Sequence, residues 1–182
     1  MKKKILISIL VIAVILGAAG IYFNYRNRNL SPPGTVSVTS GELTVTVTYS
    51  RPSARGRLIF GSEEQGALQP YGRYWRLGAN ESTEISFTTD VSFNGSPVRK
   101  GTYRMYAIPG PDAFEIGLNT ELGKWGYTEP DYSQDVLRTK VPVEKTSQPV
   151  EQHTVTLQKA EGGVDVTFEW SDTRFTVPVK IQ

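Results

Sequence analysis

The sequence predicts an all-β fold: an antiparallel β-sandwich of about 8–10 short strands, preceded by one N-terminal apolar helix. Apolar and polar residues alternate with a period of two through most of the chain, as in residues 43–49 and 164–170. Turn residues separate these runs, and the Asn94-Gly95 pair is a strong hairpin signal. After the N-terminal run, the sequence shows no convincing amphipathic helix.

The N-terminal run predicts a membrane-directed segment. Lys2–Lys4 precede an apolar stretch over residues 5–23, close to the ~20 residues with which a helix crosses a bilayer. We therefore expect a single-pass anchor in the cell membrane, with the N-terminus cytoplasmic because flanking positive charge favours that side. A signal peptide is the alternative, with residues 5–15 as its apolar region and Ala18 and Gly20 at the cleavage site. The protein would then be secreted or periplasmic.

Length and composition bound the rest of the chain. Its 182 residues suggest one domain over residues 30–182, after an anchor or signal segment with its flank over residues 1–29. Five of the 20 basic residues and none of the 18 acidic residues lie in residues 1–29, so residues 30–182 carry a formal charge of about −3. This balance gives no support to nucleic acid as a partner. The absence of cysteine excludes disulfides, thiolate zinc sites and cysteine nucleophiles, and we expect no cofactor and no metal.

The strands are expected in order along residues 30–182, each marked by apolar residues that share one face. These positions are Leu43, Val45, Val47 and Tyr49, then Ile85 and Phe87, Val91 and Phe93, Tyr103, Met105 and Ala107, Phe114, Ile116 and Leu118, Leu137, Val141 and Val143, Val155 and Leu157, Val164, Val166, Phe168 and Trp170, and Phe175, Val177, Val179 and Ile181. A domain of this size buries enough surface to be stable without disulfides.

Residues 49–83 do not follow the alternation. Five of the 11 arginines lie there and no lysine does. Tyr71, Tyr74 and Trp75 are interleaved with those arginines. Lysine and arginine both make a surface soluble, but only arginine offers a planar fork for a carboxylate, a phosphate or an aromatic face. The exclusive use of arginine therefore indicates specific recognition geometry.

Several motifs resemble a known family. The chain contains, in this order, YSRPSARGRLIFG, PYGRYWRLGANEST, GTYRMYAIPG, KWGY and DVLR. Together they resemble a bacterial extracytoplasmic family catalogued as domain of unknown function 2911, over essentially all of the chain from Ser31 onward. The resemblance implies a secreted or anchored β-rich protein. It brings no established activity, substrate or cofactor.

The preferred interpretation is a membrane-anchored binding or accessory module. We expect residues 5–23 to hold it in the membrane while the arginine and aromatic side chains face an anionic or carbohydrate ligand of the cell envelope. Neither protein partners nor oligomeric state follow from the sequence. The candidate ligand-binding residues are Arg51, Arg57, Trp75, Arg76, Asn80, Glu81, Asp135 and Arg138.

Two alternatives remain open. An envelope glycan hydrolase would use Glu81 and Asp135, with their carboxyl groups ~5–9.5 Å apart in an open cleft. A structural envelope protein would use the arginines only to tie residues 49–83 to the sandwich, and would bury them with every donor paired.

Several individual residues that could be functional also have ordinary structural explanations. Trp75 and Trp125 are either stacking platforms for sugar rings or caps of the core, whereas Trp170 lies on a clean alternating strand and is expected in the core. His153 shares its parity with Val155, which predicts a buried histidine rather than a hydrolase or metal residue. No G-x-S-x-G motif is present.

Overall fold

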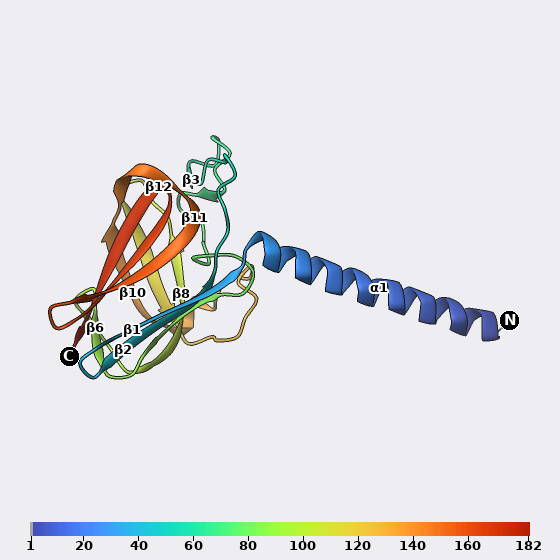
Figure 1. The fold of residues 1–182 in the computed structure, drawn as a ribbon, viewed down its shortest axis with the longest axis horizontal. Helices are drawn as coiled ribbons and strands as arrows, with labels where there is room; N and C mark the ends of the chain where they lie inside the picture. Colours follow the sequence, from blue (N-terminus) through green and yellow to red (C-terminus); the bar gives the residue numbers. More distant parts are fainter. Residues whose placement is uncertain (1) are drawn as a thin grey trace.

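One helix, α1 (Lys2–Leu30), leads into a two-layer β-sandwich in the computed structural model, which describes residues 2–182. Figure 1 shows α1 extending away from the sandwich. The helix is long and apolar enough to cross a membrane, and its apolar window is not buried against the rest of the chain. The prediction of one N-terminal apolar helix is confirmed, and its length and composition suit either an anchor or a signal sequence.

The first layer is a six-stranded antiparallel sheet. Its strands, in spatial order, are β1 (Pro33–Ser40), β2 (Leu43–Ser50), β5 (Thr83–Phe87), β8 (Gly101–Ile108), β9 (Ala113–Asn119) and β10 (Asp135–Pro142). Adjacent strands pair in a continuous register except at one irregularity between Asp135 and Leu137. Hydroxyl pairs cross from β1 to β2 on the half-exposed face, where Ser37 Oγ lies 2.8 Å from Thr46 Oγ1.

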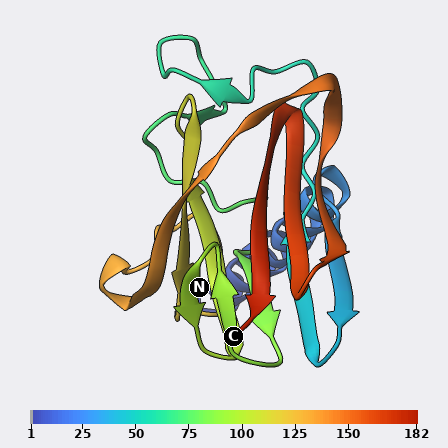
Figure 2. The same cartoon turned by 90° about the vertical axis from the view of Figure 1, so that its left-hand side faces the viewer.

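The second layer is formed by β11 (Glu144–Ala160), β12 (Gly163–Ile181), β6 (Val91–Phe93) and β7 (Ser96–Val98), in that order. β12 reverses direction at Ser171, whose φ of 55° is in the left-handed region. Its two arms lie side by side, because Thr167 Oγ1 is 2.9 Å from Thr176 Oγ1 and the Ile181 N–H donates to Gly162 O. Figure 2 shows these arms and the two layers of the sandwich.

Residues 2–182 contain twelve strands, more than the 8–10 expected. Two of them, β3 (Phe60–Gly61) and β4 (Gln69–Pro70), form a short parallel pair outside the two main sheets. Strands of two residues are too short to show an alternating pattern, so the sequence does not reveal them. The only other helical element among these residues is the 3₁₀ turn η1 (Tyr132–Gln134).

The alternating apolar positions meet between the layers. Val45 and Val47 of β2 and Val164 and Val166 of β12 are all fully buried. Trp170 is 1% exposed, which confirms its predicted place in the core. Mostly β structure in antiparallel sheets is therefore what the period-two pattern predicts, and it is what the structure shows.

A glycine on β9 makes room for a tyrosine ring on β8. Gly117 is the cross-strand partner of Tyr106. A Cβ atom at Gly117 would lie inside the van der Waals envelope of the Tyr106 ring. The ring therefore covers the glycine, and its hydroxyl reaches Asp135 Oδ2 at 2.6 Å.

We expect Gly117→Ala to lower the free energy of unfolding by about 1–3 kcal/mol, because the added methyl group displaces the buried Tyr106 ring. Chemical denaturation of the full chain in detergent measures this loss. Gly34→Ala on β1 is the control, since its Cβ would meet the Arg51 side chain at 3.0 Å and the Tyr49 ring at 3.2 Å rather than lie inside a ring. Equal stability of the two variants would contradict the steric role of Gly117.

Candidate functional site

The long segment between β2 and β5, residues 51–82, is fixed to both layers by backbone hydrogen bonds. Trp75 and Ala107 of β8 exchange two N–H···O bonds of 2.8 Å each. At the other end of the segment, the Ala54 N–H donates to Glu151 O of β11 at 2.7 Å. Because these bonds satisfy its backbone groups, the segment keeps a defined path over one end of the sandwich.

A cavity of about 700 Å³ lies beneath this segment. Besides residues 51–82, three other parts of the chain form its walls. The end of α1 supplies Asn27 and Leu30, and the loop after β9 supplies Tyr127 and Glu129. Trp170 of β12 also lines it. We call this space the arginine pocket, because Arg55, Arg57, Arg73 and Arg76 line it.

Two tryptophans from different parts of the fold meet at the inner side of the arginine pocket. The Trp75 and Trp170 rings are stacked, with centroids 5.9 Å apart and planes inclined by 23°. Trp75 is 2% exposed, so the core-cap explanation holds for it, and yet it also lines the pocket. Both indole N–H groups are buried without a hydrogen-bond partner among the described residues. The inner side of the pocket is therefore apolar, with two unused donors nearby.

His153 packs against this tryptophan pair. Its ring centroid is 5.3 Å from that of Trp75, and the side chain is fully buried, as predicted. Nε2 lies 3.0 Å from Leu77 O and must carry the proton, because a carbonyl oxygen only accepts. Burial lowers the pKa of His153 to about 4, and the positive charge of Arg51 acts in the same direction. The imidazole is thus neutral at physiological pH.

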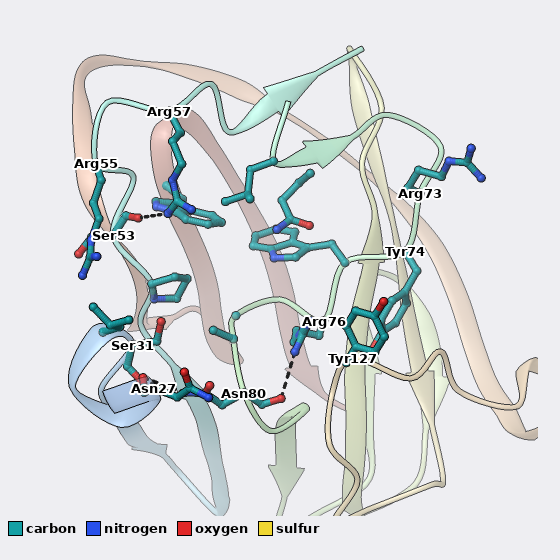
Figure 3. A pocket seen from close by; sticks show the side chains of 18 of the residues that line it. Asn27, Ser31, Ser53, Arg55, Arg57, Arg73, Tyr74, Arg76, Asn80 and Tyr127 are labelled. Carbon is teal, nitrogen blue, oxygen red and sulfur yellow. Dashed lines mark hydrogen bonds between the residues drawn. The ribbon is translucent and has the colours of Figure 1, made fainter. Parts of the chain in front are cut away.

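Four arginines line the arginine pocket: Arg55, Arg57, Arg73 and Arg76. Among the described lining residues, Glu129 is the only acidic one. Figure 3 shows Arg55 and Arg57 on one side of the cavity and Arg76 on the other, while Arg73 points away. Arg73 forms an ion pair of 3.1 Å with Glu63 at the surface. The pocket therefore carries an excess of positive charge.

Arg57 is held by backbone carbonyls rather than by a carboxylate. Its Nε donates to Ala54 O at 2.9 Å and its Nη2 donates to Ser53 O at 2.7 Å. These two bonds use part of the guanidinium, which has five N–H groups. Arg57 is thus oriented by the chain and keeps donors for another acceptor.

Arg76 occupies the opposite wall. Its Nη1 donates to Asn80 O at 3.2 Å, and its Cζ lies 5.7 Å from the centroid of the Tyr127 ring. Gly126 allows this packing, because a Cβ there would come within 2.7 Å of Arg76 Cδ. Burial lowers the pKa of the guanidinium, although an arginine stays charged at any physiological pH. A partly desolvated positive charge with free donors attracts an anion more strongly than an exposed one does.

Two of the other candidate residues lie near the arginine pocket without lining it. Arg51 is half-buried, and its side chain lies against Gly34, with Nε buried and unpartnered. Glu81 pairs with Arg28 of α1 at 2.5 Å. The Glu81 carboxylate therefore binds the end of the helix rather than facing the pocket.

Asp135 and Arg138 belong to a separate network on β10. Asp135 accepts hydrogen bonds from Tyr106, Asn119 and Arg138, at 2.6, 2.7 and 2.6 Å. Arg138 also pairs with Glu115 at 3.2 Å, and its Cζ lies 4.4 Å from the Tyr132 ring centroid. Asp135 and Glu81 share no described cavity, and each is occupied by other partners.

The structure thus brings together Arg57, Trp75, Arg76 and Asn80, and separates them from Asp135 and Arg138. Reasoning from the sequence missed Tyr127 and Glu129 in the loop after β9 and the residues at the end of α1. The KWGY motif was an available signal for Tyr127, since an aromatic pair beside two glycines is unusual in a polar loop. Proximity of the helix end to the pocket has no signature in the sequence.

These features define a β-sandwich protein with an N-terminal apolar helix and an arginine-rich pocket at the helix end. Residues 31–179 match the family described as "Protein of unknown function (DUF2911)", and the chain belongs to that family. This match confirms the resemblance carried by the five sequence motifs. Comparison with curated proteins and with solved structures finds no match.

The buried His153 predicts a loss of stability in mild acid. Its pKa in the folded protein is about 4, below the ordinary 6.5. The unfolded chain therefore binds a proton first as the pH falls, and the free energy of unfolding decreases between pH 6.5 and 4, by about 3 kcal/mol.

Urea denaturation of the full chain at several pH values measures this slope. His153→Gln, which removes the titrating group and keeps a donor for Leu77 O, should lose most of the slope across that window. A slope that is the same in both proteins would show that His153 is not its source.

Proposed function

We propose that this protein is a membrane-anchored binding module whose arginine pocket takes an anionic ligand bearing a phosphate or carboxylate group. One observation carries the proposal. Arg55, Arg57 and Arg76 line a cavity of about 700 Å³, and among the described residues none of their guanidinium groups forms an ion pair with a carboxylate. Guanidinium groups gathered without a paired carboxylate favour an anion between them.

A comparison with Arg138 weighs against a purely structural role for the pocket arginines. Arg138 is an example of structural use, because two carboxylates and an aromatic ring occupy its guanidinium. Arg57 and Arg76 instead donate only to backbone carbonyls and keep further donors. A network built for stability would pair those donors within the protein.

The glycan hydrolase alternative has less support than ligand binding. The expected pair, Glu81 and Asp135, is divided between an ion pair to α1 and the network on β10. Glu129 is the only carboxylate among the described residues that line the arginine pocket. A single carboxylate does not supply the acid and base pair of a glycosidase. Binding without catalysis is therefore the function that we propose.

The buried Trp75 and Trp170 rings close the inner end of the pocket and leave its polar rim to select the ligand. Arginine forks at that rim suit a small molecule with a phosphate or carboxylate group, such as a sugar phosphate or an acidic glycan unit. We further propose that α1 anchors the protein in the cell membrane with the sandwich on the extracytoplasmic side, since its apolar stretch is long enough to cross a membrane and Lys2–Lys4 favour a cytoplasmic N-terminus.

Calorimetric titration of the full chain tests this proposal. The protein is kept in a polyoxyethylene detergent, whose headgroup contains no sugar or charge, and is titrated with glycerol 3-phosphate, glucuronate and neutral glucose. We expect both anions to bind and glucose to bind far more weakly. Arg57→Gln and Arg76→Gln should each weaken anion binding about tenfold or more, since a hydrogen bond to a charged group is worth ~1.5–3 kcal/mol.

Arg99→Gln is the matched control, because it removes the same charge from an exposed position after β7 and outside the pocket. Its affinity for the anions should equal that of the unmodified chain. Equal weakening by all three substitutions would reduce the effect to general charge attraction, and a lack of any anion binding would refute the proposed function.

A further inference from the structure

The end of α1 is part of the arginine pocket rather than a free linker. Asn27, Leu30 and Ser31 line the cavity. Asn80, which accepts a hydrogen bond from Arg76 through its carbonyl, donates through its side chain to Ser31 O at 3.3 Å. Figure 3 shows Asn27, Ser31 and Asn80 together on one side of the pocket. The position of the pocket is therefore tied to the position of the helix end.

The length of α1 places that helix end close to a bilayer surface. The apolar stretch ends at residue 23, and the helix continues to Leu30. Seven further residues at 1.5 Å per residue add about 10 Å along the helix axis. The headgroup region on each side of the hydrocarbon core is about 5–8 Å deep. A pocket bordered by Asn27 and Ser31 then stands at the outer side of the lipid headgroups.

Exposed apolar side chains gather in the same two segments that form the pocket walls. Outside α1, every exposed large hydrophobic residue that the structure describes lies in residues 58–68 or 122–136. Those residues are Leu58, Leu68, Leu122, Trp125, Tyr127, Tyr132 and Val136. Figure 1 shows the segment between β2 and β5 and the loop after β9 on the side of the sandwich from which α1 leaves.

Trp125 and Tyr127 are the most telling of these side chains. They are 51% and 77% exposed, whereas Trp75 and Trp170 are buried. Backbone pairing of Trp125 with Glu81 places this loop beside the residue that holds Arg28 of α1. Tryptophan and tyrosine accumulate where a protein meets the membrane–water interface, because one end of the ring is apolar and the other polar.

From these placements we infer that the arginine pocket opens onto the surface of the bilayer that holds α1, and that its ligand is the phosphate of an anionic phospholipid headgroup in that leaflet. This inference rests on the proposed function and names the source of its anion. The unused donors of Arg57 and Arg76 face the phosphate from the two walls of the pocket, and Trp125 and Tyr127 rest among the headgroups.

Fluorescence quenching tests the position of the domain. The full chain is placed in lipid nanodiscs made with or without phosphatidylcholine brominated near the headgroup end of its acyl chains. We expect the brominated discs to quench the emission of Trp125, since the other two tryptophans are buried in the sandwich. Trp125→Phe should remove most of this quenching. Equal emission in both kinds of disc would overturn the inference, because the loop after β9 would then stand away from the membrane.

Thermal unfolding tests the headgroup. Discs of phosphatidylcholine alone are compared with discs that contain phosphatidylglycerol as a third of the lipid. We expect the anionic lipid to raise the unfolding midpoint by about 3 °C or more. The Arg57→Gln, Arg76→Gln double variant should lose this shift, and Arg99→Gln should keep it.

The outcomes separate the two proposals. If phosphatidylglycerol does not change the unfolding midpoint but the protein binds glycerol 3-phosphate in detergent, the lipid is not the ligand and the anion-binding function is retained. If the lipid does not change the unfolding midpoint and the protein also binds no free anion, both the anion-binding function and the lipid ligand are refuted. A shift that survives in the double variant assigns the effect to the charge of the membrane and not to the arginine pocket.

Discussion

Trp75 joins the two layers of the sandwich and the segment that covers their end. Its backbone exchanges two hydrogen bonds with Ala107 of the six-stranded sheet, and its ring stacks on Trp170 of the other sheet. Residues on either side are thereby held in place: Tyr74 donates its hydroxyl proton to Gly126 O, and Arg76 reaches Asn80 O. Trp75 therefore fixes the path of the segment beside the six-stranded sheet and, with it, one wall of the cavity.

Four of the arginines illustrate two physical classes. Arg104 and Arg138 are surrounded by acceptors: Arg104 is 1% exposed and donates to the Tyr74 hydroxyl and to Thr128 O, and Arg138 lies between two carboxylates. Arg57 and Arg76 are oriented by backbone carbonyls and keep donors unused. Both classes use the planar fork, so residue type alone does not separate a structural arginine from one that awaits a ligand.

The sequence predicts the features that depend on local pattern, and not those that depend on packing between distant residues. Period-two alternation predicts the buried faces of β2 and β12, and parity alone predicts that His153 is buried. The excess of arginine over lysine predicts that residues 49–83 form a polar site, and the cavity lies there. The sequence pattern did not reveal that Asp135 pairs with Tyr106, or that Glu81 pairs with Arg28, because contacts across 29 and 53 residues depend on the packed fold. The place of Arg138 follows from the same long-range packing.

In the proposed membrane-anchored protein, the contact between the helix end and the pocket gives α1 a role beyond attachment. Glu81 binds Arg28, and the adjacent Asn80 joins Ser31 to Arg76, so the helix end and one arginine share a short chain of polar contacts. A flexible tether would let the domain turn in any direction above the membrane. A helix that continues to Leu30 and docks on the pocket wall instead fixes the direction of the opening relative to the helix axis. Cleavage after Gly20 would leave that wall intact and remove the fixed orientation, so a site that must face the bilayer requires the anchor to stay.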